Sequence, residues 1–314
     1  MANAEQLAQL KQGPAAWNEW RKRHPRVPVD LSGADLLDGN LVHANLFGAN
    51  LRGANLARAR LAEADLSEAD LAGATLARAD LGKANLSGAH LADARLFEAR
   101  FGGANLYGAD LGRAQLVSVD FTGASLAKAS LNAADLTGAK LGRADLTGAD
   151  LTGTNVMRVT WSRKTMRGRY MGIRGVESCF GNALFRRDAL DQDFLDTLEE
   201  HWRPFWWRRA LFGLWGFLDY GRSLGGVAIF SAGWIFAFGC LYRYFDLVKY
   251  GEASANTSFS AFFFSIVTFT TLGYGDVTPN SLWGEIAASI EVIIGYVTLG
   301  LLLSVLAEKV ARRS

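Results

Sequence analysis

The sequence predicts a chain of two parts with different fold classes, a coiled β-structure in the first half and an all-α membrane domain in the second. Two observations support this division. An unbroken five-residue repeat of apolar residues fills the first half, and apolar runs long enough to cross a bilayer occur only from Leu224 onward. The composition alone, at 314 residues, a net charge of +2 and 50% hydrophobic residues, allows one large domain or two ordinary ones.

The repeat in the first half has a period of five. Every fifth residue from Leu31 to Val156 is Leu, Phe or Val, which gives 26 consecutive positions. The residue two places before each of them is Ala, except at Val29, Gly39, Val119 and Thr154. A period of five matches neither a helix face nor a strand face. A coil that turns a corner every five residues explains it, with Leu and Ala pointing inward and the polar residues facing water.

The pattern A[DN]LxG resembles the repeat of the pentapeptide-repeat family. This resemblance implies a right-handed quadrilateral β-helix with four repeats per coil, which we assign to residues 29–157. Residues 1–28 precede it and contain Trp17 and Trp20 at helical spacing. We expect them to form an N-terminal cap over the open backbone edge of the first coil.

Some members of that family imitate DNA with an acidic surface. Residues 30–155 hold 12 Asp and 3 Glu against 11 Lys and Arg, and the two signs are interleaved. Such a surface is a poor copy of a polyphosphate, so no nucleic-acid partner is expected. We favour a rigid spacer or docking surface of regulatory or scaffolding role, with a cytoplasmic protein partner of unknown identity.

Two segments join the repeat to the apolar spans. Residues 158–201 are predicted to be a basic linker and an amphipathic helix, because apolar residues recur every four positions on one face, at Leu190, Phe194, Leu198 and Trp202. Residues 202–223 mix aromatic residues with arginines and are too short in apolar sequence to span a bilayer. They are expected to form an interfacial helix, and an ordinary buried helix is the alternative.

Residues 224–311 are predicted to be a membrane domain with two spans, 224–245 and 286–306. Arginines precede the first span, and Lys309, Arg312 and Arg313 follow the second. By the positive-inside bias both termini are therefore cytoplasmic, and the expected location is the bacterial inner membrane. The segment SFSAFFFSIVTFT between the spans is too short to cross and fits a re-entrant helix that enters from outside.

The sequence TLGYG follows this re-entrant helix, at Thr271, Leu272, Gly273, Tyr274 and Gly275. Irregular backbone is tolerated at membrane depth where it lines a cavity, and its carbonyls can then face a permeating cation. The signature, placed between a pore helix and an inner helix, resembles that of two-transmembrane potassium channels. The resemblance implies a K⁺ selectivity filter at 271–275, Asp276 at the outer mouth and an inner-helix hinge at Gly295. One such segment per chain then requires a homotetramer.

The membrane domain departs from that family at two positions. Channels with a buried carboxyl behind the filter have an acid where this chain has Val267, and an indole where it has Phe263. Glu291 lies inside the second span, four residues before Gly295, and an ionisable group there is a functional candidate. It is either a charge that faces the cavity or a structural hydrogen-bonding group behind the pore helix.

The function predicted from these features is passive K⁺ permeation through a homotetrameric channel that contacts membrane lipid and carries a cytoplasmic pentapeptide-repeat domain. The alternative is a membrane-anchored, repeat-based binding protein with a non-conducting pore-like domain. An enzyme is not expected, because the four histidines are scattered and no phosphate loop or metal-ligand cluster is present in the sequence.

Overall fold

The structure is a computed structural model and describes residues 2–162, 169–202, 224–250, 259–270 and 277–311. The chain divides into two compact units, Met1–His201 and Trp202–Ser314, which are described separately.

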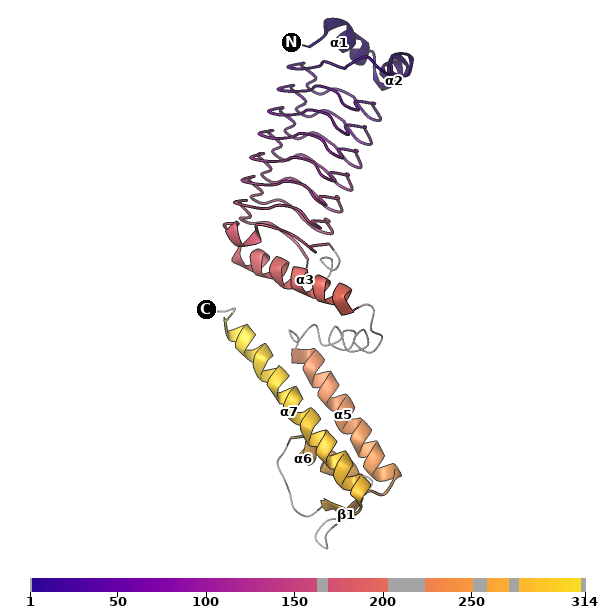
Figure 1. The fold of residues 1–314 in the computed structure, drawn as a ribbon, viewed down its shortest axis with the longest axis vertical. Helices are drawn as coiled ribbons and strands as arrows, with labels where there is room; N and C mark the ends of the chain where they lie inside the picture. Colours follow the sequence, from indigo (N-terminus) through magenta and orange to yellow (C-terminus); the bar gives the residue numbers. More distant parts are fainter. Residues whose placement is uncertain (1, 163–168, 203–223, 251–258, 271–276, 312–314) are drawn as a thin grey trace. The chain divides into compact units, whose positions relative to one another are not determined.

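The first unit is built on a coil in which each backbone level pairs with the level 20 residues further along the chain. Parallel bridges join Asp30 to Asn50, and the same step recurs at every fifth residue up to the bridge between Lys140 and Thr160. Four pentapeptides therefore complete one coil, which confirms the predicted quadrilateral β-helix (Figure 1). Hydrogen bonds between coils run from the central residues, for example from Leu31 N to Asn50 O at 2.8 Å.

Each corner of the coil is a β-turn whose third residue has a positive φ. In the first of them Ala34 N donates to Leu31 O at 3.0 Å, and Gly33 has φ 66°. Many corners place a larger residue there, such as Arg58 with φ 56°. For a residue with a Cβ, this left-handed conformation raises the free energy of the backbone by about 1–2 kcal/mol. The hydrogen bonds between coils offset this strain.

The central Leu, Phe and Val residues and their alanine partners form the core of the first unit. Most of them are 0% exposed, and the two phenylalanines of the repeat, Phe101 and Phe121, stack one coil apart with ring centroids 5.2 Å apart. The axis of the coil is therefore filled with side chains, which leaves no lumen for a ligand.

Two short helices, α1 (Ala4–Lys11) and α2 (Pro14–Arg23), lie at the start of the coil. No earlier coil donates hydrogen bonds to the carbonyl groups of the first coil. Side chains of α2 donate to them instead. Buried Trp17 donates from Nε1 to Asn45 O at 2.8 Å, and Asn18 Nδ2 donates to His43 O at 2.9 Å. The helices thus close the open backbone edge at this end.

At the other end the backbone ladder continues past the last pentapeptide, up to Phe180. Bridges join Asp150 to Arg174 and Asn155 to Phe180. Tyr170 is buried, and the short 3₁₀ helix η2 (Val176–Ser178) follows it in the chain. Residues 158–180 were expected to belong to a basic linker. Residues 169–180 extend the coil instead, because a ladder of backbone hydrogen bonds does not require the Leu and Ala period.

Helix α3 (Ala183–Trp202) ends the first unit (Figure 1). Its packed face is not the predicted one, because Leu190 and Phe194 are 38% and 62% exposed. Instead the buried residues follow steps of three and four, which track one face of a 3.6-residue helix, whereas a constant step of four drifts around it. They are Phe185, Asp188, Ala189, Gln192, Leu195 and Asp196.

The described residues of the second unit form three helices and a short strand pair. The helices are α5 (Leu224–Tyr244), α6 (Ser260–Phe269) and α7 (Leu282–Ala311), and strands β1 (Val248–Tyr250) and β2 (Val277–Pro279) pair antiparallel. Residues 225–244 and 282–307 are long and apolar enough to cross a membrane, and α6 is too short. The second span begins before the predicted residue 286. The predicted interfacial helix covers residues 202–223, of which 203–223 lie outside the described residues.

Candidate functional site

A cluster of three polar side chains lies buried where α5, α6 and α7 meet. Glu291 on α7 is 0% exposed. Its Oε2 accepts a hydrogen bond of 2.7 Å from the Tyr242 hydroxyl on α5, and its Oε1 accepts one from the Ser265 hydroxyl on α6. Ser265 Oγ also lies 2.9 Å from Ile235 O on α5. The cluster therefore links the short helix to both spans through side chains.

Helix α6 also touches α7 directly, near its own C-terminal end. A Cβ built on Gly295 would collide with the backbone carbonyl of Phe269, the last residue of α6. Gly295 lies within the continuous helix α7, and glycine there allows the two backbones to approach closely. The end of α6 is thus fixed against the middle of the second span.

The residues after 276 are fixed against the end of α5 and the strand that follows it. Strand β2 pairs with β1 in the register Val248 with Pro279. Asn280 N then donates to Leu247 O at 3.0 Å, and a Cβ on Gly284 would collide with the same carbonyl. The described residues on either side of 271–276 are consequently fixed, the end of α6 against Gly295 and β2 by its pairing with β1.

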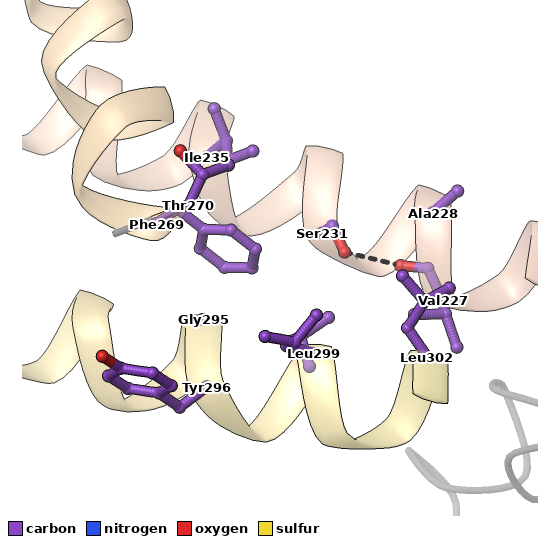
Figure 2. Close-up of a pocket in the computed structure, with 11 residues that line it drawn as sticks. Val227, Ala228, Ser231, Ile235, Phe269, Thr270, Gly295, Tyr296, Leu299 and Leu302 are labelled. Atoms are coloured by element: carbon purple, nitrogen blue, oxygen red, sulfur yellow. Dashed lines mark hydrogen bonds between the residues drawn. The ribbon is translucent and has the colours of Figure 1, made fainter. Parts of the chain in front are cut away.

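A cavity of about 340 Å³ lies below the end of α6, between α5 and α7 (Figure 2). Its walls are mainly apolar and include Phe269, Gly295 and Leu299. The Ser and Thr hydroxyls in the wall bond to carbonyls of their own helices. Ser231 donates to Val227 O at 2.8 Å, as Figure 2 shows, and Thr298 donates to Ile294 O at 2.7 Å. The space next to the end of α6 is therefore suited to apolar contacts.

The residues expected to form the filter, Thr271, Leu272, Gly273, Tyr274 and Gly275, lie outside the described residues, as does Asp276. The other predicted residues are described. Glu291 and Gly295 both contact α6, although they lie far from it in the sequence. Val267 is buried and Phe263 is 44% exposed. The carboxyl that bonds to α6 is that of Glu291 on α7, through the Ser265 hydroxyl.

Two residues of the cluster were not identified from the sequence, Tyr242 and Ser265. The signal that could have found them is the presence of hydroxyl groups in apolar helices that also contain a buried acid. A buried carboxylate requires donors, and these side chains are the ones within reach.

Comparison with known proteins gives the same division of the chain. A family model described as "Ion channel" matches residues 228–312. A model described as "Pentapeptide repeats" matches in several copies between residues 29 and 153. The curated "Two-pore potassium channel 4" of Arabidopsis thaliana is 38% identical over 65 residues, which is 21% of this chain. The match spans only 22% of that relative's own length.

Solved pentapeptide-repeat structures are also similar to the chain. HetL, from the cyanobacterium Nostoc sp. strain PCC 7120, is 32% identical with a TM-score of 0.34, over 46% of this chain and 73% of that one. A pentapeptide-repeat protein from the Arabidopsis thaliana thylakoid lumen is 34% identical with a TM-score of 0.33, over 40% of this chain and 88% of that one.

The fold and the site thus define a membrane protein with an ion-channel domain joined to a β-helix. The chain belongs to the pentapeptide-repeat proteins through its first half, and its second half matches the ion-channel family model over residues 228–312 and includes two helices long and apolar enough to cross a membrane.

Proposed function

We propose that the protein is a K⁺-selective channel in which four copies of residues 224–311 surround one pore. The observation that carries the proposal is the placement of TLGYG. Helix α6 is held against Gly295 on α7, and the filter sequence begins two residues after α6 ends. A short helix that ends at membrane depth directs its negative dipole end toward the segment that follows, which favours a cation there.

In this proposal the backbone carbonyls of residues 271–275 replace the hydration shell of K⁺, and Thr271 adds its hydroxyl at the inner end. Asp276 lies at the outer mouth. Gly273 and Gly275 permit the backbone angles that point successive carbonyls toward the ion. Because one chain has one such segment, a closed ring of four chains is required.

Glu291 supports the filter from behind rather than facing the ions. The supporting observation is its burial and its bonds to Tyr242 and Ser265, which occupy both carboxylate oxygens. Gly295 provides the close contact between α6 and α7, and bending of the inner helix at this residue is a further role that the helix allows.

The first half of the chain serves as a regulatory or scaffolding domain. With its axis filled by side chains, its outer surface is what remains for interactions. Both termini are on the cytoplasmic side of a bacterial inner membrane, as the distribution of Lys and Arg around the spans indicates.

The test is flux from the purified full-length protein in liposomes, with K⁺ and Na⁺ compared. We expect K⁺ flux that is lost, or loses its preference over Na⁺, in Gly273→Ala and in Gly275→Ala. Gly300→Ala is the matched control, because a Cβ at Gly300 on α7 meets no atom within 4 Å. Correctly inserted protein without any flux would instead support a membrane-anchored binding protein.

A further inference from the structure

One row of outward positions on the β-helix is apolar over nearly its whole length. The bridges that run from Asp35 to Asn155 in steps of 20 stack one side of every coil, and the second residue after each bridged residue forms a row on that side. We call this row the apolar strip. It consists of Leu37, Ala57, Ala77, Phe97, Val117, Thr137 and Met157.

The large members of the apolar strip are well exposed, with values of 45% for Leu37, 43% for Phe97 and 45% for Met157. The bridge from Asn155 to Phe180 adds a further exposed aromatic residue to the same side, and Phe180 is 53% exposed. A row of apolar side chains that continues from coil to coil differs from the single exposed apolar residues found on most proteins.

The other three sides do not have such a row at the equivalent positions. The opposite side carries two aromatic residues, Phe47 and Tyr107, but separates them with serines at 67 and 87. A third side is mostly small, with glycines at 82, 102 and 142, and the fourth begins with Ser32 and Arg52. The pentapeptide pattern leaves this position free in every repeat. The apolar choice is therefore specific to one side.

We propose that the apolar strip is the surface along which the β-helices of two copies of this chain pair side by side. The inference rests on the proposed tetramer, in which each β-helix is joined to a membrane unit and four of them share a small volume. The strip is one residue wide, so it buries much less than the roughly 800 Å² per partner of a stable interface. Tethering to a common pore raises the effective concentration to about the millimolar range, where a weak contact is populated.

A second copy is the partner that the apolar strip fits, because tethering to one pore keeps it near and a two-fold axis brings identical rows together. When two copies pair about a two-fold axis parallel to the coil axis, their strips run parallel and meet in register, Phe97 against Phe97. This axis divides the four β-helices of the ring into two pairs. It places the residue that follows each strip position in one copy opposite the bridged residue two places before that position in the other copy. Glu98, which pairs with Arg78 of its own chain, then faces Arg95 of the second copy. The one like-charge meeting is Asp38 with Asp35 at the far end, and Asp38 is paired with Arg58 of its own chain.

Disulfide formation in the full-length channel tests the pairing. Leu37→Cys, Phe97→Cys and Met157→Cys are made singly in a Cys240→Ser background and oxidised in membranes with copper phenanthroline. The remaining Cys179 is buried, its Sγ lies 3.1 Å from Leu151 O, and burial raises the pKa of its thiol to about 11. Tyr107→Cys is the matched control, an aromatic position of 45% exposure on the opposite side.

We expect all three strip cysteines to form dimers at an initial rate about tenfold above that of Tyr107→Cys, since contacting sites react faster than sites that meet by collision. Phe97→Ser in the Met157→Cys background should lower that rate. Equal rates at Phe97 and Tyr107 would overturn the pairing, and so would dimers at Met157 alone, which would mean that the β-helices diverge. Flux and size of the same samples report on the channel independently, so a failure of the tetramer is distinguishable.

Discussion

Glu291 is an acid inside an apolar span, and such a group costs several kcal/mol unless its oxygens are bonded. The sequence left two roles open for it. The geometry favours the structural one, because hydroxyls from the two neighbouring helices occupy both oxygens. The sequence could not decide between them, since the choice depends on which residues of α5 and α6 reach Glu291, and these lie 49 and 26 positions away.

The first prediction concerns the Tyr242 hydroxyl. Glu291→Leu leaves it buried without an acceptor, whereas Ser265 keeps Ile235 O. The single change should therefore lower stability by about 1–3 kcal/mol, and adding Tyr242→Phe should recover part of that loss, because removing both partners costs less than removing one. Thermal unfolding of the purified protein in detergent measures both. Reduced K⁺ conductance in Glu291→Gln at unchanged stability would instead place the carboxyl in the ion path.

The second prediction concerns Gly295. Its role as an inner-helix hinge was inferred from the resemblance to two-transmembrane potassium channels. The structure adds a steric reason for glycine at this position, the close contact with Phe269. Gly295→Ala should force α6 away from α7, costing about 1–3 kcal/mol and reducing K⁺ selectivity in flux assays. Gly300→Ala on the same helix has free space around the new methyl group and should leave both properties unchanged. Equal behaviour of the two variants would contradict the close contact with Phe269.

At the scale of elements, the five-residue period predicted the coil because each central side chain must point inward. The period ends at Val156, yet the ladder continues to Phe180. This extension could not be predicted, since it is held by backbone hydrogen bonds and by buried residues such as Tyr170 and Ile173 without a repeat. The face of α3 was predicted wrongly for a related reason. Apolar residues occur on two of its faces, and only contact with its neighbours selects one.

The third prediction uses that helix. Phe185 is 0% exposed and packs edge-on against Trp161, with ring centroids 5.3 Å apart, whereas Phe194 on the same helix is 62% exposed. Phe185→Ala should cost the β-helix about 3–5 kcal/mol. Phe194→Ala should cost little. The midpoint of thermal loss of the β-sheet circular dichroism signal compares the variants, and a larger effect at Phe194 would restore the face that was first predicted.

At the scale of the whole molecule, the two units have separate interiors. The coil buries its own Leu and Ala against neighbouring coils, as solenoids do, and α5, α6 and α7 pack against one another. The pattern of repeats and spans was therefore sufficient to predict that the chain has two parts. The repeat pattern placed the end of the coil at residue 157, whereas the backbone ladder continues to Phe180. This difference decides which truncations leave the remaining chain folded.

The fourth prediction is that deleting residues 1–201 leaves a tetrameric, K⁺-selective pore, because the first compact unit ends at His201 and the proposed filter uses none of it. Deleting only residues 1–156 should be worse. It removes the coils on which Tyr170, Ile173 and Phe185 are buried and leaves these apolar side chains exposed, which favours aggregation. Size analysis in detergent and K⁺ flux at equal protein density compare the two truncations with the full chain. If the longer deletion lost the tetramer while the shorter one kept it, residues 157–201 would take part in assembly, and the two units would not be independent.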